Sequence, residues 1–151
     1  MTSTLTIIAI TSAQTHAVRH PILRKGRPKK DCVFSGDELD STFHLGAYRN
    51  DKLIGVLSAF KQPHPELKAT MSFQIRGVAV MDAFQRQGVG QQLMHSAETL
   101  AKEKKADLIW LNARVKAKAF YISLGYTPHG EAFEIASIGT HFCFFKFIHD
   151  A

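Results

Sequence analysis

The sequence predicts one α/β domain built around a mixed sheet, and three observations support this prediction. The chain has 151 residues, of which 45% are hydrophobic and 21% are charged, as is typical of one globular domain with a single core. Strand-like and helix-like segments follow one another in the order β-α-β-β-β-α-β-α-β-β. No repeat or long linker interrupts them. We therefore expect a single domain over residues 1–151 with helices flanking the sheet.

Each element is predicted from local patterns. Strands are expected where β-branched and aromatic residues gather between turn residues, and helices where apolar residues recur with a period near 3.6, as at Leu93, Ala97 and Ala101. The expected elements are a strand over residues 4–10, a helix from Ala13 capped by Ser12, a loop with one short helical turn over 26–40, strands over 42–49, 52–61 and 70–80, a helix over 90–104, a strand over 107–113, a helix over 115–124, and two strands over 126–133 and 140–148.

Turn and helix-breaking residues set the predicted boundaries. Pro21 is expected to break or kink the first helix, because its ring occupies the position of a helical N–H. Asn50 and Asp51 fit the turn of a hairpin. Gly125 fits the left-handed position that ends a helix, and the last two strands are expected to pair antiparallel.

The formal net charge is +6, and the densest basic cluster is Arg24–Lys30. Such a cluster fits nucleic acid, an anionic membrane surface, an anionic ligand or a solvated loop. We favour the solvated loop, because no aromatic residues alternate with these charges as a nucleic-acid surface requires. No apolar run approaches the ~20 residues of a membrane span, and the N-terminus lacks the pattern of a signal peptide. We expect a cytoplasmic protein that binds neither nucleic acid nor membrane.

The cysteines and histidines give no sign of a metal or a disulfide. Cys32 and Cys143 are far apart, and Cys143 lies in an apolar strand-like run where a thiol is usually a small buried hydrophobe. Among the eight histidines only His16 and His20 have i, i+4 spacing, and no third ligand accompanies them. We therefore expect reduced cysteines and no metal.

The most informative segment runs from Val78 to Gly90, where a strand leads through a polar loop into an amphipathic helix. Glycines at 88 and 90 allow close approach to the backbone, and unpaired amides at a helix N-terminus bind phosphate well. The loop is not a P-loop, because Gln91 and Gln92 follow where Lys and Ser or Thr are required. It is not a dinucleotide fingerprint either, because Leu93 replaces the third small residue.

Two motifs in this half of the chain resemble the GNAT superfamily of N-acetyltransferases. Gln85-Arg86-Gln87-Gly88-Val89-Gly90 resembles the acetyl-CoA loop of that family, Arg/Gln-x-x-Gly-x-Gly/Ala. Downstream, the segment from Phe120 to Tyr126 resembles its Phe/Leu-Tyr-x-x-Leu-Gly-Phe segment. The resemblance covers residues 73 to about 148, whereas the N-terminal half matches only the order of elements.

The resemblance implies a fold and a cosubstrate. We expect a GNAT-like mixed, mostly antiparallel sheet of about six or seven strands, splayed between the fourth and fifth strands, with acetyl-CoA bound there. The pantetheine arm would bind the strand backbone, and the pyrophosphate would bind the loop amides. The expected acetyl-CoA contacts are Val78, Ala79, Val80, Gln85, Arg86, Gln87, Gly88, Val89, Gly90, Gln91, Asn112 and Arg114. The sequence departs from the family at Arg114, where many relatives carry an asparagine.

The resemblance also implies catalytic roles. Tyr121 occupies the place of the family's general acid, which protonates the leaving thiolate of CoA, and a ring packed under the sheet is its alternative role. A base is harder to find, because Gln74 and Arg76 stand where some relatives place a glutamate. The remaining candidates are Glu134, His141 and Glu38.

We therefore expect an enzyme that transfers an acetyl group from acetyl-CoA to a primary amine of a small molecule or peptide. A non-catalytic acyl-CoA-binding module is the alternative, because no base is obvious. The acceptor region mixes acidic and basic residues and leaves a cationic and an anionic acceptor equally open. The apolar C-terminal strand could support a homodimer.

Overall fold

The computed structural model describes residues 4–136 and 138–148. In these residues seven strands form one sheet in the order β1-β2-β3-β4-β5-β7-β6. The pairs β1–β2, β2–β3, β5–β7 and β7–β6 are antiparallel, whereas β4 and β5 pair in parallel. The predicted mixed, mostly antiparallel sheet is confirmed. Within the same residues, no helix is both long enough and apolar enough to span a membrane.

The chain divides into two compact units. Unit 1 comprises Met1–Phe60 and Arg76–Leu100, and unit 2 comprises Lys61–Ile75 and Ala101–Ala151. The elements are β1 (Leu5–Ile10), α1 (Ser12–Leu23), a 3-10 turn (Lys29–Cys32), β2 (Phe43–Arg49), β3 (Lys52–Lys61), β4 (Ser72–Val80), a second 3-10 turn (Asp82–Phe84), α2 (Val89–Glu103), β5 (Leu108–Arg114), a third 3-10 turn (Val115–Ala117), α3 (Lys118–Ser123), β6 (Thr127–Ile135) and β7 (Gly139–Phe147).

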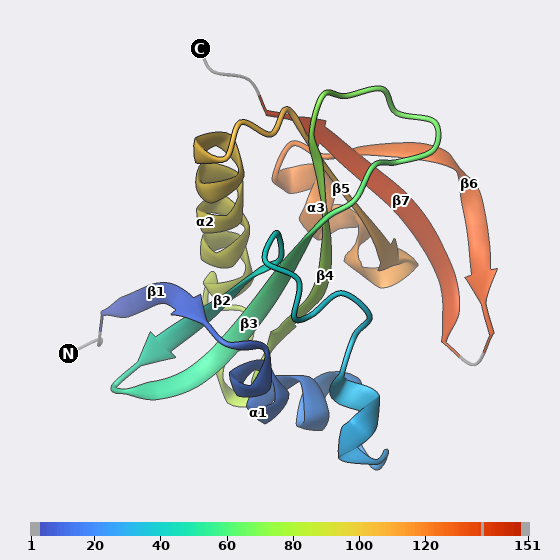
Figure 1. The fold of residues 1–151 in the computed structure, drawn as a ribbon. Coiled ribbons are helices and arrows are strands. Elements are labelled where there is room, and N and C mark those ends of the chain that lie inside the picture. The colour runs from blue at the N-terminus through green and yellow to red at the C-terminus, as the bar shows by residue number, and fades with distance from the viewer. Residues whose placement is uncertain (1–3, 137, 149–151) are drawn as a thin grey trace. The chain divides into compact units, whose positions relative to one another are not determined.

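In unit 1, β1, β2 and β3 lie side by side as an antiparallel meander (Figure 1). The turn between β2 and β3 is the predicted one. Asn50 and Asp51 have φ values of 52° and 61°, as a two-residue hairpin turn of type I′ requires. Val56 of β3 packs with Val18 of α1 and Ala79 of β4 in one buried cluster, so the N-terminal helix covers this part of the sheet.

Helix α1 differs from the prediction at both ends. Its N-cap is Thr11 rather than Ser12, because Thr11 and Gln14 form a reciprocal capping box in which each side chain accepts from the other's backbone N–H. Pro21 does not break the helix, which continues to Leu23. A proline removes one backbone hydrogen bond, and only two residues of α1 follow Pro21.

In unit 2, the parallel ladder of β4 and β5 joins Ser72–Ile75 to Leu108–Leu111. β7 pairs with β5 on one side and β6 on the other, and β6 and β7 form a long hairpin (Figure 1). β7 is therefore not an edge strand. The edge strands of the described sheet are β1 and β6, so pairing of two copies edge to edge would involve one of these. The homodimer stays a prediction.

Two aromatic residues of this unit differ in burial. Trp110 is 7% exposed and belongs to the core, whereas Phe120 on the short helix α3 is 36% exposed. Both cysteines are free and buried, and burial was predicted for Cys143. Burial raises the pKa of the Cys143 thiol to about 11, with a smaller contribution from the charge of Glu66, so the thiol stays protonated at neutral pH.

Candidate active site

The loop between β4 and α2 has an unusual backbone. Arg86 and Gly88 both have positive φ values, 64° and 81°, on either side of Gln87. Alternating left- and right-handed residues point successive N–H groups to one side and make an anion-binding concavity. The carbonyl of Gly88 accepts the first helical hydrogen bond, from Gln92, so the loop ends directly at the N-terminus of α2.

The amides of this loop remain available. Within the described residues, no backbone N–H from 86 to 91 donates to a backbone carbonyl, as expected at a helix start. The Gln85 side chain donates to the carbonyl of Val80 at 3.0 Å and to Asp82 at 3.3 Å, which ties the loop to the end of β4. The Arg86 side chain is exposed, so it can add a charge-assisted contact to an anion.

The end of β4 leads into this loop through three residues of different exposure. Ala79 is 4% exposed and packs into the core, whereas Val78 and Val80 are half-buried. The N–H of Met81 donates to the carbonyl of Ile54 on β3 at 2.8 Å. This bond fixes the chain where strand becomes loop, and all of these residues belong to unit 1.

Tyr121 belongs to unit 2, on α3. Its ring packs against the rings of Phe120, Tyr126 and Phe144, with centroid distances of 4.9, 6.0 and 5.6 Å. Burial raises the pKa of Tyr121 to about 12. Its hydroxyl has no hydrogen-bond partner in the described part of the chain. Packing of the ring therefore fixes the position of the phenol. The hydroxyl keeps its proton at neutral pH and can donate a hydrogen bond.

The helix that carries Tyr121 ends as the sequence predicts. Gly125 has a φ of 93°. Its N–H donates to Ile122 and the N–H of Tyr126 donates to the carbonyl of Tyr121, both at 3.0 Å, which is the hydrogen-bond pattern of a Schellman motif. This motif fixes the direction in which the chain leaves α3 for β6.

Comparison with known proteins identifies the family. The model of the acetyltransferase (GNAT) family matches residues 11–126. An uncharacterised N-acetyltransferase, YitI of Bacillus subtilis (strain 168), is 32% identical over 142 residues, which cover 94% of this chain and 95% of that protein. This chain belongs to the GNAT acetyltransferase family. It is accordingly an acyltransferase.

Solved structures of GNAT N-acetyltransferases share the fold. An aminoglycoside 6′-N-acetyltransferase complexed with coenzyme A matches with a TM-score of 0.75 at 13% identity, covering 97% of this chain and 98% of that one. The ribosomal-protein-S18-alanine N-acetyltransferase from Escherichia coli matches with a TM-score of 0.74 at 18% identity, covering 98% and 96%. At these identities the likeness extends to the fold alone.

The remaining residues expected from the GNAT resemblance lie in unit 2. Asn112 and Arg114 are exposed on β5, opposite Cys143 and His141 of β7 in register. His141 is 7% exposed, and its Nδ1 lies 2.8 Å from the carbonyl of Gly139. A carbonyl only accepts, so Nδ1 is the donor in this contact, and Nε2 is the nitrogen that can take a proton when the ring is neutral.

The other base candidates are less suited to take a proton. Glu134 is exposed and accepts from the hydroxyl of Thr140. Glu38 in unit 1 is exposed and accepts from the hydroxyl of Ser12. Each of these carboxylates therefore already accepts a hydrogen bond from a neighbouring hydroxyl.

Sequence reasoning missed a buried polar network in unit 1. Arg19 is 0% exposed and forms a bidentate ion pair with Asp37 at 2.7 and 3.0 Å. It also donates to Ser58 at 2.8 Å, and Ser58 lies 2.6 Å from Nδ1 of His44. Burial raises the pKa of Asp37, but the hydrogen bonds from Arg19 and the Phe34 amide and the charges of Arg19 and His44 outweigh it and lower this pKa overall.

Arg76 lies beside this network and is not a base. Its guanidinium stacks over Phe34 at 4.8 Å and Phe60 at 5.4 Å. Burial lowers its pKa, with a further lowering by Arg19 and Arg24 that Asp37 partly offsets. The local sequence does not predict the buried network, because Arg19, Asp37, His44 and Ser58 come from four separate segments.

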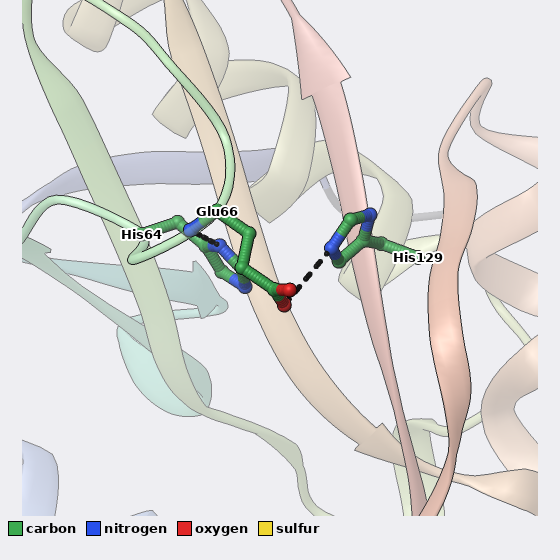
Figure 2. Close-up of side chains that lie close together, drawn as sticks. All are labelled: His64, Glu66 and His129. Carbon is green, nitrogen blue, oxygen red and sulfur yellow. Dashed lines mark hydrogen bonds and ion pairs between the residues drawn. The ribbon is translucent and has the colours of Figure 1, made fainter.

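A second group that spacing missed lies in unit 2. His64 and Glu66 from the β3–β4 loop and His129 from β6 lie with their ligand atoms within 4.8 Å of one another. Figure 2 shows the carboxylate of Glu66 between the two imidazoles. The sequence expectation of no metal-ligand grouping considered only neighbouring histidines, and this group joins residues 65 positions apart.

Proposed function

We propose that this enzyme transfers an acetyl group from acetyl-CoA to a primary amine of a small molecule or peptide, in a complex that holds both substrates. The observation that supports it most is the loop at the start of α2. Its amides from Arg86 to Gln91 have no backbone acceptor within the described residues, and the positive end of the α2 dipole lies behind them. A pyrophosphate supplies the acceptors that these donors need.

The proposed contacts follow from the chemistry of acetyl-CoA. The amides of Arg86, Gln87, Gly88, Val89, Gly90 and Gln91 bind the pyrophosphate, and the backbone of Val78, Ala79 and Val80 binds the pantetheine arm. Gln85, Asn112 and Arg114 contribute side-chain contacts. The neighbouring GNAT structure complexed with coenzyme A supports this assignment at the level of the fold.

In the proposed reaction the amine nitrogen attacks the thioester carbonyl carbon. The new N–C bond forms first and gives a tetrahedral oxyanion, which a strand amide near Val80 stabilises. The C–S bond then breaks as this oxyanion collapses. Tyr121 gives its proton to the departing thiolate. The amine proton passes to a base, for which we propose Nε2 of His141, because it keeps its lone pair while Nδ1 donates to Gly139.

The test is calorimetric titration with acetyl-CoA, using Gly88→Glu and a matched control. Gly88 and Gly26 have similar φ values of 81° and 77°, and a Cβ at either position meets nothing within 4 Å. Both substitutions therefore carry the same backbone strain, about 1–2 kcal/mol, and the same charge. Only Gly88→Glu places a carboxylate in the loop, where repulsion by a phosphate about 4 Å away costs up to about 4 kcal/mol.

We expect acetyl-CoA binding to weaken about 100-fold or more in Gly88→Glu and to stay at the wild-type value in Gly26→Glu. Equal binding by both variants would place acetyl-CoA elsewhere. A panel of amines, followed by release of CoA thiol, then tests transfer itself. Tight binding without release across a broad panel would instead favour a module that binds acyl-CoA without turnover.

A further inference from the structure

The second residue group in unit 2 has the composition of a metal site. Its members are His64 and Glu66 of the β3–β4 loop and His129 of β6, and Cys143 of β7 lies beside them. Two imidazoles, a carboxylate and a thiol are the donor types that Zn²⁺ prefers. Nothing in the acetyl-transfer reaction requires this combination, so the group calls for its own explanation.

The fold holds these donors close together. Pro63 and Pro65 flank His64 and restrict the backbone on both sides. The N–H of Glu66 donates to Nδ1 of His64 at 3.0 Å, and the His64 ring stands edge-on to Trp110 with the centroids 4.8 Å apart.

The β6–β7 hairpin supplies the other two donors. His129 lies directly opposite Cys143 in the β6–β7 register. The ring of His64 also stands edge-on to that of His129, at 5.3 Å between centroids. The loop and the hairpin therefore bring their donors to one place.

The distances match the edges of a zinc tetrahedron. Nε2 of His129 lies 3.3 Å from Oε1 of Glu66, and Nε2 of His64 lies 3.5 Å from Sγ of Cys143. Zinc bond lengths with tetrahedral angles place N and O ligands about 3.4 Å apart, and N and S ligands about 3.6 Å apart. Two opposite edges of the tetrahedron are thus already formed.

We propose that His64, Glu66, His129 and Cys143 bind one Zn²⁺ ion that fastens the β3–β4 loop to the β6–β7 hairpin. Glu66 has a side chain that is 74% exposed and His129 one that is 29% exposed, so an ion can enter from solvent. Binding releases the thiol proton to the solvent. The proton on Nε2 of a neutral His129 ring moves to Nδ1, so that Nε2 can bind the ion.

Metal binding also changes one hydrogen bond in a way that can be observed. If Nδ1 of His64 binds the ion, its lone pair is used. If Nε2 binds the ion, the ring proton moves to Nδ1. In either case the N–H of Glu66 loses its acceptor, so we expect the Glu66 amide resonance to shift on adding Zn²⁺.

The first experiment is titration of the whole chain with Zn²⁺, in wild type, a His64→Ala/His129→Ala variant and a His95→Ala control. His95 is exposed on α2 and lies outside the group. We expect one ion per chain in wild type and in the control, and a loss of at least 100-fold in affinity in the double variant. Equal affinity in all three proteins would overturn the proposal.

A second variant avoids any doubt about folding. Glu66→Gln changes one exposed carboxylate, and Glu131→Gln changes another exposed carboxylate of β6 as its control. We expect Zn²⁺ affinity to fall about 10-fold or more for Glu66→Gln alone. If the two variants bind Zn²⁺ with equal affinity, Glu66 is not a ligand and the four-ligand arrangement is wrong.

Co²⁺ tests the sulfur ligand directly. A thiolate on cobalt gives a charge-transfer absorption, which we expect in wild type and not in Cys143→Ser. Its absence in wild type would refute the site as proposed. Zn²⁺ should also raise the melting temperature of wild type, whereas Mg²⁺ should not, because it prefers oxygen ligands. These readouts need no acetyl-CoA, so they stand or fall independently of the proposed function.

Discussion

Replacing Tyr121 by phenylalanine tests the proposed general acid with little disturbance of the fold. The ring of Tyr121 is packed among Phe120, Tyr126 and Phe144, and phenylalanine preserves these contacts. The hydroxyl has no hydrogen-bond partner among the described residues. Its removal leaves no buried group unpaired, so the free energy of unfolding should change by no more than about 0.5 kcal/mol.

The kinetic effect should be much larger. A positioned general acid contributes about 100- to 10,000-fold to the rate, which corresponds to about 3–5 kcal/mol of transition-state stabilisation. We expect kcat to fall by this factor in Tyr121→Phe, with the KM for acetyl-CoA nearly unchanged. Because burial raises the pKa of Tyr121 to about 12, the phenol stays protonated and the deficit should persist from about pH 6 to about pH 10.

The assay is release of CoA thiol at saturating acetyl-CoA, beside urea unfolding of the same preparations. Tyr121→Ala is the contrasting variant, since loss of the ring should also cost about 3–5 kcal/mol of stability. Wild-type kcat in Tyr121→Phe over the whole pH range would refute the leaving-group role. If kcat is unchanged in Tyr121→Phe while Tyr121→Ala loses much of its stability, the role of Tyr121 is packing instead.

Three further predictions concern stability and are measured by urea unfolding. Because burial raises the pKa of Tyr121 to about 12 from 10.0, the folded chain keeps a proton that the unfolded chain loses. Wild type should therefore lose about 2–3 kcal/mol relative to Tyr121→Phe as the pH rises from about 10 to about 12, and parallel curves would contradict this. Asp37→Ala should cost about 3–5 kcal/mol by leaving the Arg19 charge buried alone, against at most about 1 kcal/mol for Asp31→Ala in an exposed ion pair. Folding lowers the pKa of Asp37. The difference in free energy of unfolding between wild type and Asp37→Ala should therefore persist at neutral pH and shrink as the pH falls below the ordinary pKa of 3.8. A difference that stays constant with pH would show that the charge of Asp37 is not what stabilises the fold. Gly125→Ala should cost about 1–2 kcal/mol, because alanine is strained at a φ of 93°, and a neutral effect would mean that α3 ends differently.

Local features of the sequence predicted the fold well, because single residues determine them. Asn50 and Asp51 tolerate positive φ, which makes the β2–β3 turn predictable, and Gly125 does the same for the end of α3. The cap of α1 was placed one residue too late. Thr11 and Ser12 both offer a hydroxyl, and only the reciprocal bond with Gln14 at the third helical position decides between them.

The loop that we propose to bind acetyl-CoA could be located in the sequence for a similar reason, whereas the buried ion pair could not. Gly88 and the helix that follows it are adjacent in sequence, and their spacing matches a family motif. Arg19 stands in a helix with no pattern around it that distinguishes a buried arginine from an exposed one. Its partner Asp37 lies 18 positions away, in a loop whose path depends on tertiary packing.

The proposed zinc site shows why strand register limits such predictions further. Phe133 pairs with His141, so a regular hairpin would place Glu131 opposite Cys143. Instead the ladder shifts between His129 and Phe133, where Gly130 has a φ of 74°, and His129 takes that place. Between these two pairs, β6 advances by four positions, from Phe133 to His129, whereas β7 advances by only two, from His141 to Cys143. A bulge of this kind exchanges a carboxylate for an imidazole beside the thiol, and no count of residue spacing in the sequence would include it.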